Sequence, residues 1–124
     1  MQVGDQYTQT ITVLEKDAAA VMGSGSLNVF ATPAMVAYME NTAMKMVQGD
    51  MQEGSDTVGV EINVKHTKAS AIGEKITLTA TISAIEGRKI GFSIEAKDSK
   101  GDVVGTAEHF RFVIDKERFM SKIK

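Results

Sequence analysis

Apolar residues occupy most positions of the stretch 30–47, and this pattern predicts a helix that is buried on most of its surface. Thr32 is a favoured N-cap residue for this helix, and Pro33 is tolerated at the first helical position because no N–H is needed there. Gly49 marks the expected end. The predicted polar stripe is narrow and consists of Ala34, Ala37, Asn41, Lys45 and Gln48.

Alternation of apolar and polar residues predicts strands on both sides of this helix. In the stretch 57–66, Val58, Val60, Ile62 and Val64 alternate with polar residues or glycine, which is typical of a half-buried strand. The same reasoning, together with a high content of β-branched residues, predicts further strands at 7–14, 76–84, 90–96 and 103–114. A helical turn is expected at 17–21, loops at 22–26 and 50–56, and a short tail of mixed charge at 115–124.

A single apolar helix beside a sheet that is apolar on one face implies that the sheet wraps around the helix. The expected fold class is therefore α+β, with an antiparallel sheet around one long central helix. The 124 residues fit a single domain, 1–124.

Composition and charge exclude several functions. The formal net charge of −2 argues against a nucleic-acid partner, and the absence of cysteine excludes disulfides, thiolate metal sites and a cysteine nucleophile. The two histidines show no metal-ligand spacing, so neither metal nor cofactor is expected. The polar first residues predict no signal peptide, and no apolar run is long enough to cross a membrane. We expect a soluble, cytoplasmic protein.

Three residues carry the candidate chemistry. Glu40 is a carboxylate within the apolar part of the helix, where such a group is expected to be paired or to have a raised pKa. His66 continues the apolar face of the strand 57–66 at its end. With Thr32 at the helix start, these residues form a set suited to acyl-transfer hydrolysis, and the free amides there offer an oxyanion site. Each residue alone is explained at least as well by a purely structural role.

Spacing places a limit on this set. Thr32 and Glu40 are eight positions apart in the sequence, which corresponds to roughly 12 Å along a helix axis. Their side chains therefore cannot bond directly within one chain. Either a second subunit completes the site, or Thr32 lies in a loop that folds back.

Several other residues receive structural interpretations. His109 shares a strand face with Ala107 and Arg111, and we expect this face to be polar and to lie at the surface or an interface. Gly23 and Gly25 fit a flexible loop, because no phosphate-loop lysine follows them. A second group consists of lysines near the end of the strand 57–66, which are expected to be solvated but are placed to meet a nucleotide phosphate: Lys65, Lys68 and Lys75.

The chain resembles the hotdog-fold acyl-CoA thioesterases, and within them the fluoroacetyl-CoA thioesterase-like family. The resemblance rests on the run from Ala31 to Val36 that leads to Glu40, on the strand ending in His66, and on the order of elements along nearly the whole chain. In that family a threonine, a glutamate eight residues later and a histidine twenty-six residues beyond it form the catalytic triad. Thr32, Glu40 and His66 have these spacings.

The resemblance implies a homodimer whose two sheets join edge to edge, possible further pairing into tetramers, and acyl-CoA bound at the interface without a cofactor. It places Phe30, Pro33, Ala34 and Lys68 at the substrate. The fluoroacetyl specialist has an aromatic-lined lid before the helix, whereas Phe30 is the sole aromatic residue of the stretch 22–30. A general short or medium acyl thioester is therefore the expected substrate.

Two alternatives remain open from the sequence. A hotdog hydratase would require an Asp/His pair within one segment, and the residue five positions before His66 is Glu61, on the opposite face. The other alternative is a module that binds acyl-CoA, or another small ligand, without catalysis. Release of free thiol from acyl-CoA substrates separates hydrolysis from binding.

Overall fold

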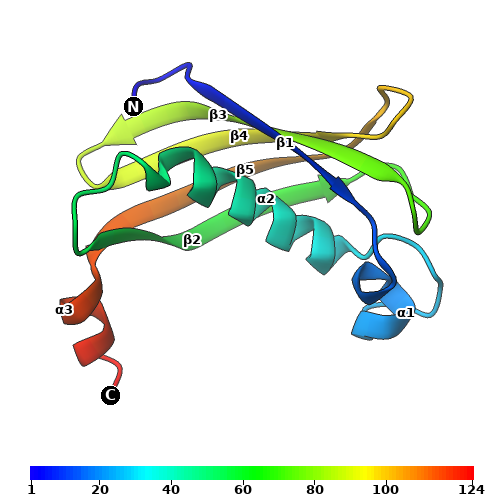
Figure 1. Ribbon diagram of the computed structural model, residues 1–124, viewed down its shortest axis with the longest axis horizontal. Coiled ribbons are helices and arrows are strands. Elements are labelled where there is room, and N and C mark those ends of the chain that lie inside the picture. Colours follow the sequence, from blue (N-terminus) through cyan, green and yellow to red (C-terminus); the bar gives the residue numbers. More distant parts are fainter.

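The computed structural model describes residues 1–124, which form a five-stranded antiparallel sheet, one long helix and three short helices (Figure 1). The strands are β1 (Gln6–Thr12), β2 (Ser55–His66), β3 (Lys75–Glu86), β4 (Lys89–Lys97) and β5 (Val103–Asp115). The long helix is α2 (Thr32–Gln48). The short helices are the 3-10 helix η1 (Glu15–Asp17), α1 (Ala19–Met22) and α3 (Lys116–Ser121).

The sheet has the strand order β1-β3-β4-β5-β2, so the two strands that flank α2 along the chain form its two edges. Helix α2 lies across the sheet and contacts all five strands (Figure 1). The predicted α+β architecture, with one central helix wrapped by an antiparallel sheet, is confirmed.

The core lies between α2 and the sheet. Met35, Met39 and Val47 are fully buried on the helix side, so these two methionines belong to the core. They pack against alternating apolar residues of β3 and β4, which are Ile76, Leu78, Ala80, Ile82, Ile90, Phe92, Ile94 and Ala96. Each such large side chain contributes about 1.5–3 kcal/mol of burial free energy.

The predicted alternation of β2 is correct only for its second half. A bulge between Gly59 and Glu61 inserts Val60 as an extra residue opposite β5. After the bulge, Ile62 and Val64 pack against the core, whereas Val60 is 53% exposed. Val58 pairs with Phe112, whose side chain is also exposed. The expectation that Val58 and Val60 share the buried face with His66 is therefore wrong.

The ends of the chain's helices also differ from expectation. The N-cap of α2 is Ala31, so Thr32 is already helical and does not cap. Ala34 is buried and not part of a polar stripe, because η1 and α1 lie beside it. The tail forms the unpredicted helix α3, whose N-cap Asp115 accepts a hydrogen bond from the Arg118 amide. No helix is both long and apolar enough to span a membrane.

Candidate active site

The start of α2 and the end of β2 meet, and this meeting brings two of the predicted residues together. Thr32 Oγ1 lies 2.8 Å from His66 Nδ1, within hydrogen-bonding distance. The ring of Phe30 contacts the His66 ring edge-on, with 6.1 Å between the ring centroids. Thr32 is therefore paired with a histidine instead of an amide of its own helix.

The environment of His66 favours a neutral imidazole. Burial lowers the pKa of His66, and the backbone of Lys68 offsets only part of this effect. In the neutral tautomer that carries its proton on Nε2, Nδ1 can accept a hydrogen bond from the Thr32 hydroxyl. Nε2 is buried and has no hydrogen-bond partner. The pair thus has the arrangement of a hydroxyl nucleophile and its base.

A pocket of about 370 Å³ opens over this pair. It is lined by residues from α1, the stretch before α2, the helix start and the segment after His66, which are Ala19, Ser24, Val29, Phe30, Ala31, Thr32, Pro33, His66, Thr67, Lys68 and Ala69. Of the four expected substrate-binding residues, Phe30, Pro33 and Lys68 line the pocket and Ala34 does not. This volume suits a small ligand or one arm of a larger one.

Two backbone amides at the start of α2 are free. Neither the Thr32 nor the Ala34 amide has a hydrogen-bond acceptor, and Pro33 has no N–H. The helix start is held in place by Asp17, whose carbonyl accepts the Ala31 amide and whose carboxylate accepts the Tyr38 hydroxyl at 2.9 Å. Burial and this bond raise the pKa of Tyr38 to about 12. The amides and the helix dipole can stabilise an oxyanion in the pocket.

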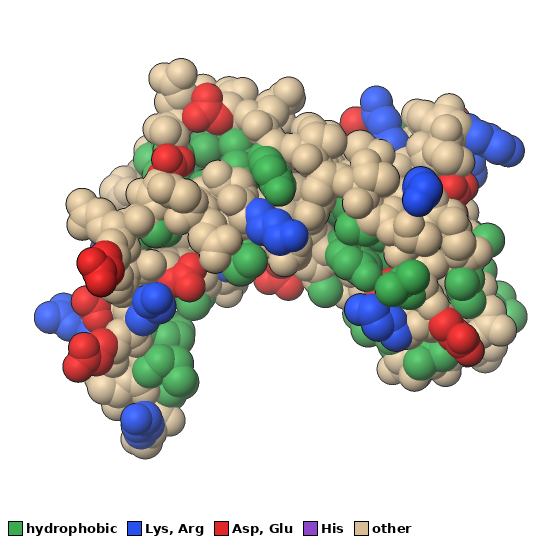
Figure 2. Space-filling view, viewed as in Figure 1, with side chains coloured by type: hydrophobic (Ala, Val, Ile, Leu, Met, Phe, Trp, Pro, Cys, Tyr) green, Lys and Arg blue, Asp and Glu red, His purple; other side chains and the backbone are tan.

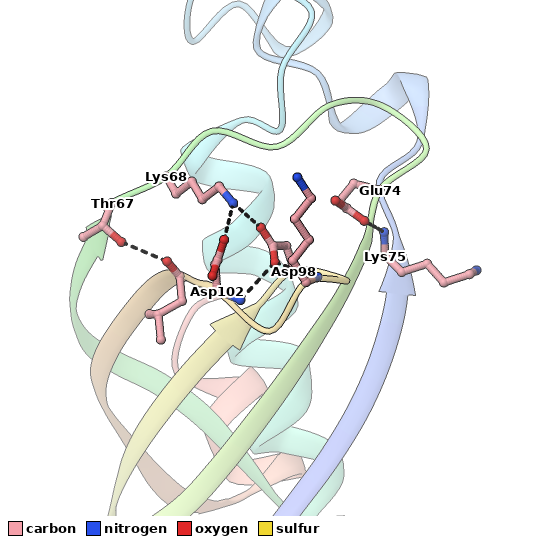
Figure 3. Close-up of polar contacts among 8 residues, drawn as sticks. Thr67, Lys68, Glu74, Lys75, Asp98 and Asp102 are labelled. Carbon is pink, nitrogen blue, oxygen red and sulfur yellow. Dashed lines mark hydrogen bonds and ion pairs between the residues drawn. The ribbon is translucent and has the colours of Figure 1, made fainter.

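Lys68 is tied to two carboxylates of the β4–β5 turn. Its ammonium lies 2.6 Å from Asp98 and 2.8 Å from Asp102, and both contacts are drawn as dashed lines in Figure 3. The hydrogen bonds that Lys68 donates to Asp102 and Asp98 raise the pKa of Lys68, and the bond from Lys68 in turn lowers the pKa of Asp98. These two ion pairs hold the segment after His66 against the β4–β5 turn. Lys68 is exposed, as the sequence suggested, but its ammonium is paired with these two carboxylates.

Glu40 lies elsewhere in the same chain. A Cβ atom added to Gly59 would be 2.7 Å from Glu40 Oε2, so the carboxylate lies beside Gly59 on β2. Seven positions of extended strand separate Gly59 from His66, which corresponds to roughly 20 Å. Within one chain the structure joins Thr32 to His66 and keeps Glu40 apart from them.

The prediction that His109 lies at the surface or an interface is wrong. His109 and Arg111 are on the inner face of β5, where both are buried, and Phe92 stacks on the His109 ring. The alternation of side chains along β5 correctly predicted that His109 and Arg111 share one face of the strand. That face was expected at the surface because its residues are polar, but it points into the protein. Both residues can be buried because each has hydrogen-bond partners on β2. No group of three or more acidic or histidine side chains could hold a metal ion.

The sequence profile of one family, described as fluoroacetyl-CoA-specific thioesterase, matches residues 13–117. The fluoroacetyl-CoA thioesterase of Streptantibioticus cattleyicolor is 34% identical over 130 aligned positions, which cover 100% of this chain and 93% of the relative. The chain belongs to this family. It is thus an acyl-CoA thioesterase, a hydrolase with the hotdog fold.

Solved structures agree with this assignment. A crystal structure of a phenylalanine-to-alanine mutant of the fluoroacetyl-CoA-specific thioesterase has a TM-score of 0.93 and 29% identity, covering 99% of this chain and 95% of that one. A thioesterase superfamily member from Thermus thermophilus, at 20% identity, has a TM-score of 0.91 and covers 98% of this chain and 90% of its own. The second comparison supports the fold alone.

Proposed function

We propose that this thioesterase works as a homodimer in which Thr32 and His66 of one protomer act together with Glu40 of the partner subunit on a short or medium acyl-CoA. The bond between Thr32 and His66 beside the pocket at the start of α2 is the observation that carries this proposal. A cytoplasmic location and assembly beyond the dimer remain predictions.

The position of Glu40 supports a site shared between two chains. β2 is an edge strand, so one side of its backbone has no strand partner. If two copies join β2 to β2 antiparallel about a two-fold axis between Ile62 and Asn63, His66 lies opposite the partner's Gly59. Residues directly opposite each other are about 5 Å apart on the same face. The partner's Glu40 then approaches His66, instead of lying roughly 20 Å away within one chain.

The surface beyond β2 also fits a second copy. In Figure 2 the molecule is hollowed between the α1 end and the α3 end, and hydrophobic side chains gather on both sides of the hollow. Large exposed apolar residues of these two ends are Val21, Met22 and Leu27, and Phe119, Met120 and Ile123. Apolar patches of this kind are typical of protein–protein contacts.

The proposed reaction begins at the thioester carbonyl. Its oxygen is bound by the free amides of Thr32 and Ala34, where negative charge develops. Thr32 Oγ1 bonds to the carbonyl carbon as its proton passes to His66 Nδ1. The C–S bond then breaks, and His66 gives this proton to the sulfur of CoA.

Hydrolysis of the acyl–threonine ester completes the cycle. The partner's Glu40 takes a proton from water, and the water oxygen bonds to the acyl carbon. The C–O bond to Thr32 breaks, and the proton held by Glu40 returns to the threonine oxygen. Because burial lowers the pKa of His66, the imidazole is in its basic form at neutral pH.

Substrate selectivity is proposed from the residues around the pocket. Phe30 and Pro33 are placed to contact the acyl end, and Lys68 is placed near the mouth for the phosphates of CoA, whereas the side chain of Ala34 lies outside the pocket lining. Phe30 is the one aromatic side chain of the pocket lining besides the imidazole. We therefore expect hydrolysis of acetyl- and other short acyl-CoA substrates without strong preference for fluoroacetyl-CoA.

The test is thiol release from a panel of acyl-CoA substrates by the parent and by mixed variants. Thr32→Ala and Glu40→Gln homodimers should each be almost inactive. When equal amounts are exchanged into heterodimers, one intact site forms per heterodimer, and about a quarter of parental activity should return. Activity that stays absent after verified exchange contradicts the shared site, and parental activity in the Glu40→Gln homodimer contradicts a role for Glu40.

A further inference from the structure

Three polar side chains gather around Gly59 on the inner side of β2. A Cβ atom built on Gly59 would lie 2.7 Å from Glu40 Oε2, 3.1 Å from His109 Cε1 and 3.3 Å from Arg111 Nη1. The proposed reaction uses Glu40 but gives no task to His109 or Arg111. Both are buried, and buried ionisable groups need compensating partners.

The hydrogen bonds of His109 define its protonation state. Nδ1 lies 2.8 Å from the Glu61 carbonyl oxygen, which can only accept, so Nδ1 carries a proton. Nε2 lies 3.2 Å from Arg111 Nη1, which can only donate, so Nε2 is the acceptor. His109 is therefore neutral. Burial, and to a smaller extent the charge of Arg111, lower the pKa of His109 in agreement with this state.

Arg111 is held rigidly by these contacts. Nε donates to Thr57 Oγ1 at 2.9 Å and Nη2 donates to the Thr57 carbonyl at 3.0 Å, while Nη1 donates to His109. The guanidinium makes no ion pair within 4 Å, so its charge is compensated at longer range. Burial lowers the pKa of Arg111, and the charges of Glu40, first, and Asp56 oppose this effect.

We propose that His109 is a positioning residue that fixes the plane of the Arg111 guanidinium, and that the positive charge of Arg111 in turn attracts the Glu40 carboxylate and keeps it in place beside Gly59. This inference rests on the proposed function of Glu40. The groups that surround His109 are Arg111 on its own strand, Glu40 on α2, the Glu61 carbonyl on β2 and the Phe92 ring on β4. Among these, Glu40 is the group with a task in the reaction.

The experiment is a double-mutant cycle between His109 and Glu40, read by single-turnover hydrolysis of acetyl-CoA. His109→Leu should lower the rate constant about 10-fold or more with less than a twofold change in KM, because the carboxylate loses its position. In the Glu40→Gln background the same substitution should change the residual rate less than twofold. An equal loss in both backgrounds overturns the proposal.

A second variant separates positioning from packing. His109→Gln retains a side-chain oxygen that can accept the Arg111 N–H, so it should recover most of the activity that His109→Leu loses. Equal losses in the two variants overturn the proposal. Thermal unfolding of each variant confirms that the fold is intact, and His109→Gln alone carries the cycle if His109→Leu does not fold. Parental activity of Glu40→Gln would instead contradict the proposed function itself.

Discussion

Replacement of Gly59 by alanine is the sharpest test of the position of Glu40. The added Cβ would lie 2.7 Å from Glu40 Oε2, well inside van der Waals contact. The added Cβ cannot move away from Glu40, because it would also lie 3.1 Å from His109 Cε1 and 3.3 Å from Arg111 Nη1. Both of these groups are fixed by buried hydrogen bonds. The flexible end of Glu40 must therefore move by roughly 1 Å to restore contact distance.

A displacement of this size has different consequences for activity and for stability. Misplacing a catalytic group by about 1 Å can lower a rate by about 100-fold, so kcat of Gly59→Ala should fall between about 10-fold and 100-fold. KM should change less than twofold, because the pocket beside Thr32 is untouched. Since the clash is relieved by a flexible side chain, the free energy of unfolding should fall by no more than about 1–2 kcal/mol.

The assay is steady-state thiol release from acetyl-CoA, with urea unfolding and light scattering on the same samples. Gly49→Ala is the matched control, because Gly49 has a φ of −70° and an added Cβ there would have no atom within 4 Å. This control should keep the parental kcat. A parental kcat in Gly59→Ala, with the dimer intact, would refute the placement of the working carboxylate beside Gly59.

Three further predictions concern the other parts of the site. Thr32→Ser should keep substantial activity, and Thr32→Ala should lose it. Because Thr32 is exposed and does not cap the helix, each substitution should change the free energy of unfolding by less than about 1 kcal/mol. A stable acyl-enzyme trapped on Thr32→Ala would contradict the role of Thr32 as nucleophile. Lys68→Gln should raise KM for acetyl-CoA several-fold but not for acetyl-pantetheine, which lacks the nucleotide phosphates, and Lys65→Gln is its control. The free energy of unfolding should be nearly constant above pH 6.5 and fall as the pH drops below it, because the folded-state pKa values of His66 and His109 are lowered and the unfolded chain binds more protons there. Urea unfolding between pH 5 and pH 8 measures this dependence, and His109→Gln should make the free energy of unfolding depend less steeply on pH.

The fold and two residues of the site follow from patterns that are local in the sequence. Apolar residues recur with a period of about 3.6 in the helix and of 2 in the strands, and this difference distinguishes the two kinds of element. The α+β architecture then requires only that the helix and the sheet each have one apolar face. Thr32 and His66 lie at the ends of two elements, and the structure brings these ends together with 2.8 Å between Oγ1 and Nδ1.

The errors have physical causes that single elements do not reveal. The bulge at Val60 changes which residues of β2 face inward, and a bulge depends on pairing with residues of β5 that lie 49 or more positions later in the chain. Arg111 can be buried because Thr57 of β2 accepts two of its hydrogen bonds. The N-cap was misplaced by one residue because Thr32 bonds to a histidine from another element.

The proposed division of the site between two chains rests on the rigidity of its elements. A helix separates Thr32 from Glu40 by roughly 12 Å, and a strand separates His66 from Gly59 by roughly 20 Å, so no side-chain rotation can close the site within one chain. If two chains pair their β2 strands antiparallel about a two-fold axis, the end of β2 in one chain lies beside the start of β2 in the other. The two α2 helices are related by the same axis. In the proposed dimer, the rotation that places the partner's Gly59 opposite His66 also brings the partner's Glu40 toward the pair formed by Thr32 and His66. In this proposed arrangement one symmetric contact builds two sites, so we expect dissociation of the dimer to abolish hydrolysis even though each chain retains its fold and its Thr32–His66 bond.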